Sequence, residues 1–176
     1  MKTIVMDIFN PASIAKAMKE LEAFRANLKT KTAEFVKQLG DRGVQIADVK
    51  FGEAQYDGTN DVTVHIEERG ENSVAVVAVG NATLFIEFGT GIIYPDIHPE
   101  AHQLGMNRGE YGYGFGNNIW GWTYEGDPGS TGVVISQGMK AGKVHTFGNP
   151  ANMCMYYTVQ ELENIFEETA RRVFNG

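Results

Sequence analysis

The feature that most constrains the fold is a long amphipathic pattern over residues 11–40. Asn10 is a favourable N-cap, and Pro11 suits the first helical position, where its missing N–H costs nothing. Gly40 predicts the end of the helix. The predicted helix has about 29 residues and is roughly 43 Å long. Its apolar face has the three- and four-residue spacing of a helix and consists of Ile14, Met18, Leu21, Phe24, Leu28, Phe35 and Leu39.

A helix of this length is longer than a small domain can cover with its own core. The chain has 176 residues, which is enough for one domain and one core, so we expect a single domain spanning residues 1–176. Two interpretations of the long apolar stripe stay open. Either the helix lies across a sheet of its own chain, or part of the stripe meets a partner.

Segments rich in alternating or β-branched residues predict an antiparallel β-meander over residues 43–80. Segments 44–52 and 61–69 alternate, and segment 72–80 is β-branched. His65 falls on the solvent-facing side of its strand. Residues 81–91 fit either a strand or a short helix capped by Asn81 and ended by Gly89, and the pattern favours the helix. The segment is expected to form a joint to the next part of the chain.

Glycine and aromatic residues dominate that next part. Twelve of the 21 glycines and seven of the aromatic residues fall within 105–148. Long loops in compact domains are usually functional or ordered by a partner, and aromatic side chains supply contact area. Residues 92–148 are therefore predicted to be an extended docking loop. The candidate docking residues are Tyr111, Tyr113, Phe115, Trp120, Trp122 and Tyr124.

A final helix is predicted over residues 149–175, beginning at Asn149–Pro150. Its apolar stripe is approximate, and Arg171 and Arg172 near its end match the helix dipole. The predicted fold is α+β, with a long N-terminal helix, an antiparallel β-sheet meander, a Gly- and aromatic-rich loop and a C-terminal helix.

Few residues suggest chemistry. Asp96, His98, Glu100 and His102 could bind zinc, which leaves a small metal-dependent hydrolase as a remote alternative. Two prolines, at positions 95 and 99, prevent the regular helix that would align the two histidines. No serine lies in a nucleophile motif, and no glycine segment has the context of a phosphate loop. The residues alone therefore support no enzymatic site, and we assign no catalytic, cofactor-binding or metal-binding residues.

Two single residues have structural interpretations. Cys154 is expected to be a small buried core residue. Glu87 lies between apolar residues and is expected to be half-buried and bonded to backbone N–H groups of the glycine turn after it.

Charge is unevenly distributed. The net charge of -7 argues against nucleic-acid binding by phosphate neutralisation. Residues 12–40 carry six basic and three acidic residues, whereas residues 41–158 carry six basic and fourteen acidic residues. The asymmetry suits a solvated surface, head-to-tail association of copies, or an acidic wall along which DNA slides. There is no apolar run of about 18 residues and no signal-peptide pattern, so we expect a protein made in the cytoplasm with no membrane partner.

Three short blocks occur in a fixed order within residues 84–165. They contain Glu87, Phe88, Gly89, Thr90 and Gly91, then Trp122 and Tyr124, then Gly148, Pro150, Ala151, Met155 and Tyr156. This series resembles the tail-component, or head–tail joining (tail-completion), family of long-tailed bacteriophages. The chain departs from the family pattern at Met153–Cys154, where Pro-Phe or a similar pair is usual.

The resemblance implies a non-enzymatic virion protein, assembled in the bacterial host cytoplasm. It would form a ring, expected to be hexameric, in the neck between the portal or connector and the tail tube. Its partners would be adjacent neck or connector proteins and the tail terminator or tail tube protein, with DNA passing through the lumen without specific binding. A tail terminator ring that caps the tail tube is the alternative. In this interpretation the Glu87–Gly91 block is a structural joint.

Overall fold

The computed structural model describes residues 3–91, 98–106, 119–130 and 132–175. The predicted α+β class, with a long N-terminal helix, antiparallel sheets and a C-terminal helix, is confirmed. The elements are α1 (Pro11–Gly52), β1 (Thr63–Gly70), β2 (Ser73–Val79), α2 (Thr83–Phe88), β3 (Trp122–Tyr124), β4 (Val133–Val134), β5 (Val144–Thr146) and α3 (Cys154–Asn175).

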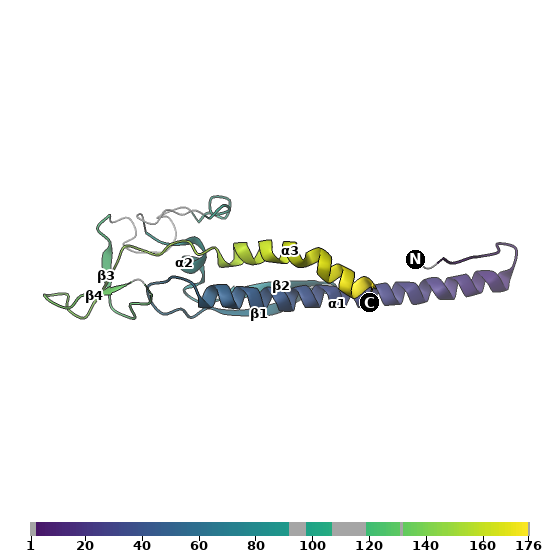
Figure 1. Ribbon diagram of the computed structural model, residues 1–176, viewed down its shortest axis with the longest axis horizontal. Helices are drawn as coiled ribbons and strands as arrows, with labels where there is room; N and C mark the ends of the chain where they lie inside the picture. Colours follow the sequence, from purple (N-terminus) through teal and green to yellow (C-terminus); the bar gives the residue numbers. More distant parts are fainter. Residues whose placement is uncertain (1–2, 92–97, 107–118, 131, 176) are drawn as a thin grey trace.

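The first helix, α1, forms the long axis of an elongated molecule (Figure 1). The Asn10 side chain accepts hydrogen bonds from the N–H groups of Ala12 and Ser13, so the predicted helix start is confirmed. The predicted end at Gly40 is wrong, because the helix continues to Gly52 and has 42 residues. Residues 44–52, predicted as a strand, are its last turns.

Gly40 and Gly43 do not end α1 because both lie where neighbouring elements approach the helix backbone. A Cβ atom on Gly40 would lie 2.8 Å from Val74 Cγ2 of β2. A Cβ atom on Gly43 would lie 2.8 Å from Val76 Cγ2 of β2 and 3.1 Å from Leu162 Cδ1 of α3. Each glycine costs the helix about 1 kcal/mol, and the close packing that it permits offsets this cost.

A side chain at position 43 is expected to destabilise the protein. Gly43→Leu must displace side chains of both β2 and α3, and overpacking of this kind costs about 1–3 kcal/mol. The gain in helix propensity offsets about 1 kcal/mol of that cost. Thermal unfolding followed by circular dichroism should give a lower Tm for Gly43→Leu than for Gln45→Leu, a matched change on the exposed side of α1. Equal Tm values would contradict the close approach.

The hairpin of β1 and β2 lies beside the C-terminal half of α1 (Figure 1). Its antiparallel register pairs Thr63 with Val79 and Ile66 with Val76. The predicted meander over residues 43–80 is therefore reduced to this hairpin. His65 is exposed, as predicted.

The last helix, α3, packs along the middle of α1. The ring centroids of Phe35 and Phe166 are 5.1 Å apart, and those of Phe35 and Phe174 are 5.9 Å apart. The ammonium group of Lys31 donates a hydrogen bond to the Phe174 carbonyl oxygen at 3.2 Å. This contact marks where α3 ends beside α1.

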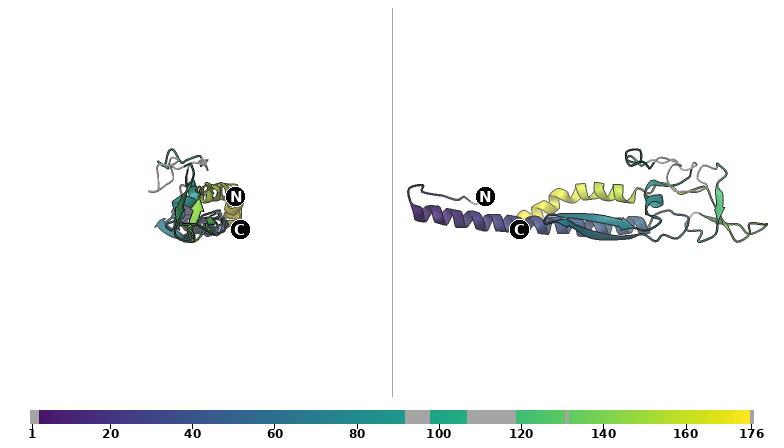
Figure 2. Two further views of the ribbon diagram at one scale, coloured as in Figure 1. Left: turned by 90° about the vertical axis from the view of Figure 1, so that its left-hand side faces the viewer. Right: turned by 180° about the vertical axis from the view of Figure 1, so that it is seen from behind.

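The N-terminal part of α1 projects beyond α3 and the hairpin, as the right-hand view in Figure 2 shows. Its apolar residues Met18, Leu21, Phe24 and Leu28 are between 45% and 57% exposed. The first interpretation of the long stripe, a helix lying on its own sheet, therefore applies to the C-terminal half of α1. The stripe of the projecting half is exposed.

The core lies where the end of α1, α2 and the start of α3 meet. It consists of Ala47, Phe51, Ala82, Ile86 and Cys154. In α1 the buried positions 43, 47 and 51 recur every four residues, a helical period that the sequence pattern of 44–52 concealed. Across the part of the chain that the structure describes, no helix is long and apolar enough to cross a membrane.

The prediction of one extended loop over residues 92–148 is partly wrong. β3, β5 and β4 form a three-stranded antiparallel sheet, in that order, within residues 122–146. Ser130 fixes this sheet to the end of α1, because its N–H donates to the Tyr56 carbonyl oxygen and its hydroxyl accepts from the Tyr56 N–H. The sheet lies at the opposite end of the molecule from the projecting half of α1 (Figure 1).

Candidate functional site

The Glu87 carboxylate is buried where α2 meets α3. Its side chain is 6% exposed. Its Oε2 accepts a hydrogen bond from the Met155 N–H at 2.7 Å, and its Oε1 accepts one from the Tyr156 N–H at 3.0 Å. The first N–H groups of a helix have no partner within the helix, and a negative charge there also suits the helix dipole. Glu87 therefore caps α3 across 68 residues of sequence.

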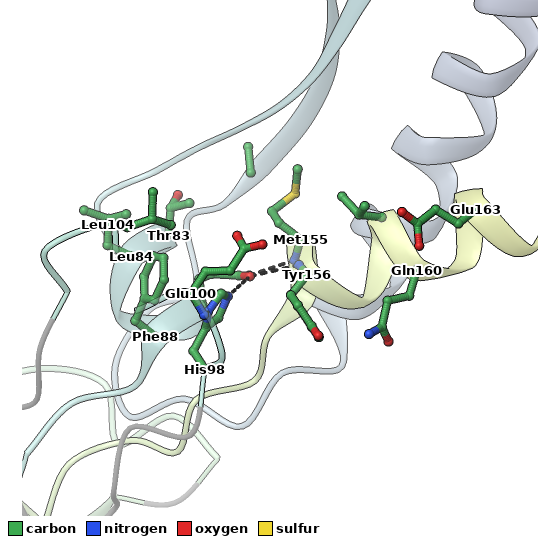
Figure 3. Close-up of a pocket in the computed structure, with 13 residues that line it drawn as sticks. Thr83, Leu84, Phe88, His98, Glu100, Leu104, Met155, Tyr156, Gln160 and Glu163 are labelled. Atoms are coloured by element: carbon green, nitrogen blue, oxygen red, sulfur yellow. Dashed lines mark hydrogen bonds and ion pairs between the residues drawn. The ribbon is translucent and has the colours of Figure 1, made fainter. Parts of the chain in front are cut away.

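His98 makes the third contact to this carboxylate (Figure 3). Its Nε2 lies 3.0 Å from Glu87 Oε1, and its Nδ1 accepts a hydrogen bond from the Glu100 N–H at 3.1 Å. Because Nδ1 accepts, the ring proton sits on Nε2 and is donated to Glu87. The ring packs against Phe88 and Tyr156, at centroid distances of 4.4 Å and 5.4 Å.

The structural role predicted for Glu87 has different partners from those expected. The side chain is buried rather than half-buried, and its donors are α3 and His98 rather than the glycine turn. Both carboxylate oxygens accept hydrogen bonds, and both ring nitrogens of His98 are used. This arrangement fixes the position of α3 relative to α2.

The predicted cap of α2 is also wrong. Asn81 does not cap the helix: its N–H and its side-chain amide both donate to Asp61 Oδ2, at 2.9 Å and 2.8 Å. Ala82 occupies the N-cap position and has no side-chain hydrogen bond. Asp61 also accepts from the Ala82 N–H, and these hydrogen bonds lower the pKa of its carboxyl group, that from Ala82 most. Gly89 ends α2 with a φ of 77°, as predicted.

The predicted joint residues Gly89, Thr90 and Gly91 pair with the segment just before α3. Thr90 donates its N–H to the Asn149 carbonyl oxygen at 2.8 Å, and the Thr90 hydroxyl accepts from the Asn149 N–H at 2.9 Å. Gly89, Gly91 and Gly148 have φ values of 77°, 82° and 105°. A Cβ atom on Gly148 would overlap the Thr90 carbonyl oxygen. Only glycine allows the two segments to cross so closely.

Two asparagines that the sequence interpretation missed hold this crossing together. Asn152 donates from its side chain to the carbonyl oxygens of Gln55 and Ile86, at 3.0 Å and 3.2 Å, and accepts from the Gln55 N–H at 2.8 Å. Asn149 is buried and accepts from the Asp57 N–H. One available signal was the pair of asparagines flanking Pro-Ala, since such side chains often replace backbone hydrogen bonds in non-helical segments.

These contacts explain why the predicted start of the last helix is wrong. Pro150 and Ala151 lie in a segment that is neither helix nor strand, and α3 begins at Cys154. Met153, just before the helix, has a φ of 53°. Cys154 is 1% exposed, and burial, with the Glu87 carboxylate nearby, raises the pKa of its thiol to about 12. The prediction of a buried core cysteine is confirmed.

A pocket of about 450 Å³ opens beside this joint, between α2, residues 98–104 and the first turns of α3 (Figure 3). We call it the α2–α3 pocket. Apolar Leu84, Leu104 and Val159 in its lining are 47%, 55% and 53% exposed. Glu100 and Glu163 also line it.

The structure describes only three of the four candidate zinc ligands: His98, Glu100 and His102. Asp96 lies outside the described residues, and His102 is exposed while His98 is buried against Glu87. Among the residues that are described, no group of three or more His, Cys, Asp or Glu side chains could hold a metal ion.

The predicted docking residues fall into two sets. Tyr111, Tyr113 and Phe115 lie outside the described residues. Trp122 and Tyr124 lie on β3 and are partly buried, whereas Trp120 is 77% exposed. Other apolar residues at this end of the molecule are also exposed, and we refer to the whole set as the distal apolar surface: Ile119, Trp120, Val133, Val134 and Met139.

Comparison with known proteins finds no similar protein. The chain matches no protein-family model, no curated protein and no solved structure. Its own geometry therefore defines the site: a joint capped by Glu87, the α2–α3 pocket beside it, and exposed apolar side chains toward both ends of the molecule.

Proposed function

We propose that the chain is a head–tail joining, or tail-completion, subunit of a long-tailed bacteriophage, forming a ring in the neck between the portal or connector and the tail tube. One observation carries the proposal. An elongated body exposes apolar side chains on the projecting half of α1 and again on the distal apolar surface (Figure 1). Exposed apolar side chains that lie together often mark surfaces that bind other proteins, and we assign these two regions to such contacts.

The joint supports the same function. The first and third blocks of the phage-family resemblance, residues 87–91 and 148–156, are distant in sequence but meet through the hydrogen bonds of Glu87 and Thr90. These residues thus share one structural task, the attachment of α3 to α2. The residues of these two blocks therefore lie together in one structural unit.

Charge and symmetry fit a ring around DNA. A net charge of -7 repels DNA and so permits its passage without tight binding. Copies of one chain that associate head to tail form a ring when the rotation between neighbours closes. The distal apolar surface is the part that we assign to the next ring or to the tail tube. A tail terminator ring is the alternative assignment for the same surface.

Electron microscopy of lysates from the encoding phage, with and without this gene, tests the proposal. Deletion is expected to leave full heads beside detached tails of normal length. Abnormally long tails would indicate a terminator instead, and infectious virions would contradict both assignments. A plasmid copy carrying Trp120→Asp and Val133→Asp should fail to restore plaques, whereas one carrying Gln45→Leu should restore them.

A further inference from the structure

The projecting half of α1 has an apolar face that its own chain leaves exposed. Met18, Leu21, Phe24 and Leu28 form this face, which we call the tip stripe. Near its end, Lys29 pairs with Glu71 of the hairpin, and α3 reaches only to Lys31. The views in Figures 1 and 2 agree that the helix continues past both elements.

The tip stripe has the spacing of a helix that binds in a groove. Leu21, Phe24 and Leu28 stand at positions i, i+3 and i+7, the anchor pattern of an amphipathic helix in an apolar groove. Arg25 lies beside the stripe, four residues after Leu21 and three before Leu28. Within the described part of the chain, Arg25 has no ion-pair partner.

The α2–α3 pocket is complementary to this stripe in both shape and charge. It offers exposed Leu84, Leu104 and Val159 as apolar lining. Glu100 and Glu163 also line the pocket, and neither carboxylate has an ion-pair partner among the described residues. The same contrast holds over longer stretches, since residues 12–40 carry a net charge of +3 and residues 41–158 one of -8. Complementary charges of this kind orient two proteins as they meet.

The tip stripe cannot reach the pocket of its own chain. α1 is one continuous helix, and the pocket lies beside its C-terminal end, where Lys50 pairs with Glu161, next to the pocket residue Gln160. From Phe24 to Phe51 the helix axis extends about 40 Å. A pocket occupied by this stripe must therefore belong to a second copy.

We propose that the tip stripe of one copy binds in the α2–α3 pocket of a second copy. This inference rests on the proposed function, for which it supplies the contact between neighbouring subunits. The contact is heterologous, so each added copy leaves a new tip and a new pocket free. Association continues in this way until a ring closes.

Two surface variants test the contact with purified full-length protein. The tip variant carries Leu21→Asp and Phe24→Asp, and the pocket variant carries Leu104→Asp and Val159→Asp. All four side chains are at least half exposed, so both variants should keep the circular dichroism spectrum of the wild type. Light scattering coupled to size exclusion is expected to give an oligomer for the wild type and a monomer for each variant. An equimolar mixture of the two variants should give a heterodimer and nothing larger, because only one productive pair of surfaces remains.

Matched controls separate this contact from a general effect of added charge. Ala23→Asp with Ala26→Asp places the same charges, at the same spacing, on the opposite, exposed side of the same helical turns and should leave the oligomer intact. Arg25→Glu should weaken association at least about tenfold, the factor that corresponds to 1.4 kcal/mol. Adding Glu100→Arg and Glu163→Arg to Arg25→Glu should restore it.

Several outcomes would overturn the proposal. A tip variant that oligomerises like the wild type would remove the stripe from the interface. A mixture that stays monomeric, or a pocket variant that still oligomerises, would assign the stripe to another surface or to a copy of itself. A wild type that stays monomeric at about 100 μM, a concentration at which a contact of micromolar affinity is saturated, would refute the contact. The phage deletion would still decide the neck function independently, and infectious virions would refute that function while leaving a measured head-to-tail contact in place.

Discussion

Glu87→Ala is expected to lower the free energy of unfolding by about 3–5 kcal/mol. This is the loss that is usual when one partner is removed from a buried ion pair. The substitution leaves three donors without an acceptor: the N–H groups of Met155 and Tyr156 and the Nε2–H of His98. A buried donor without a partner costs about 1–3 kcal/mol. Since whole domains are stable by only about 5–15 kcal/mol, we expect a large fall in the urea midpoint, measured by circular dichroism at 222 nm.

Two further variants show whether the loss comes from this network. Glu87→Gln keeps the shape of the side chain and one accepting oxygen. Its free energy of unfolding should therefore lie between that of the wild type and that of Glu87→Ala. Glu167→Ala also removes a carboxylate, one that lies on α3 itself and pairs there with Arg171, but this pair is exposed and should contribute under about 1 kcal/mol. If Glu87→Ala were no more damaging than Glu167→Ala, Glu87 would not be the cap of α3.

Gly148→Ala is the second substitution with a large expected effect, a loss of at least about 2 kcal/mol. The φ of 105° disfavours any side chain, and the new Cβ would overlap the Thr90 carbonyl oxygen. The backbone cannot move aside without breaking the hydrogen bonds between Thr90 and Asn149. Thermal unfolding should show a lower Tm, together with weaker association if the adjacent pocket is displaced.

Gly142→Ala is the control for Gly148→Ala. Gly142 also has a positive φ, 83°, but no atom lies within 4 Å of the position that its Cβ would occupy. The difference between the two variants therefore isolates the close crossing from the cost of the dihedral angle itself, about 1–2 kcal/mol. Equal losses would show that the crossing is not tight.

The fold class could be predicted because the start of a helix and the strands of a hairpin are determined by residues that are close together in the sequence. Asn10–Pro11 marks the start of α1, and alternation around His65 marks β1. Gly40 was misinterpreted because glycine both ends helices and lets another element approach. Which role applies depends on what lies opposite, here Val74 of β2, and no neighbouring residue in the sequence reveals that.

The candidate site was predictable only in part, for the same reason. A carboxylate among apolar residues indicated that Glu87 has fixed partners, but its partners on α3 lie 68 and 69 residues further along the chain. His98 suggested a metal ligand because its true partner, Glu87, is eleven residues away on another element. Asn149 and Asn152 were overlooked because Pro150 between them suggested the first turn of a helix.

The uninterrupted course of α1 has a mechanical consequence. A continuous helix behaves as a lever, and here Gly40 and Gly43, pressed against β2 and α3, set its pivot. The arm from Phe24 to Gly43 is about 29 Å long, so a tilt of about 5° at this pivot moves Phe24 by about 2.5 Å. Small rotations in the body thus become displacements large enough to break or make a side-chain contact at the tip.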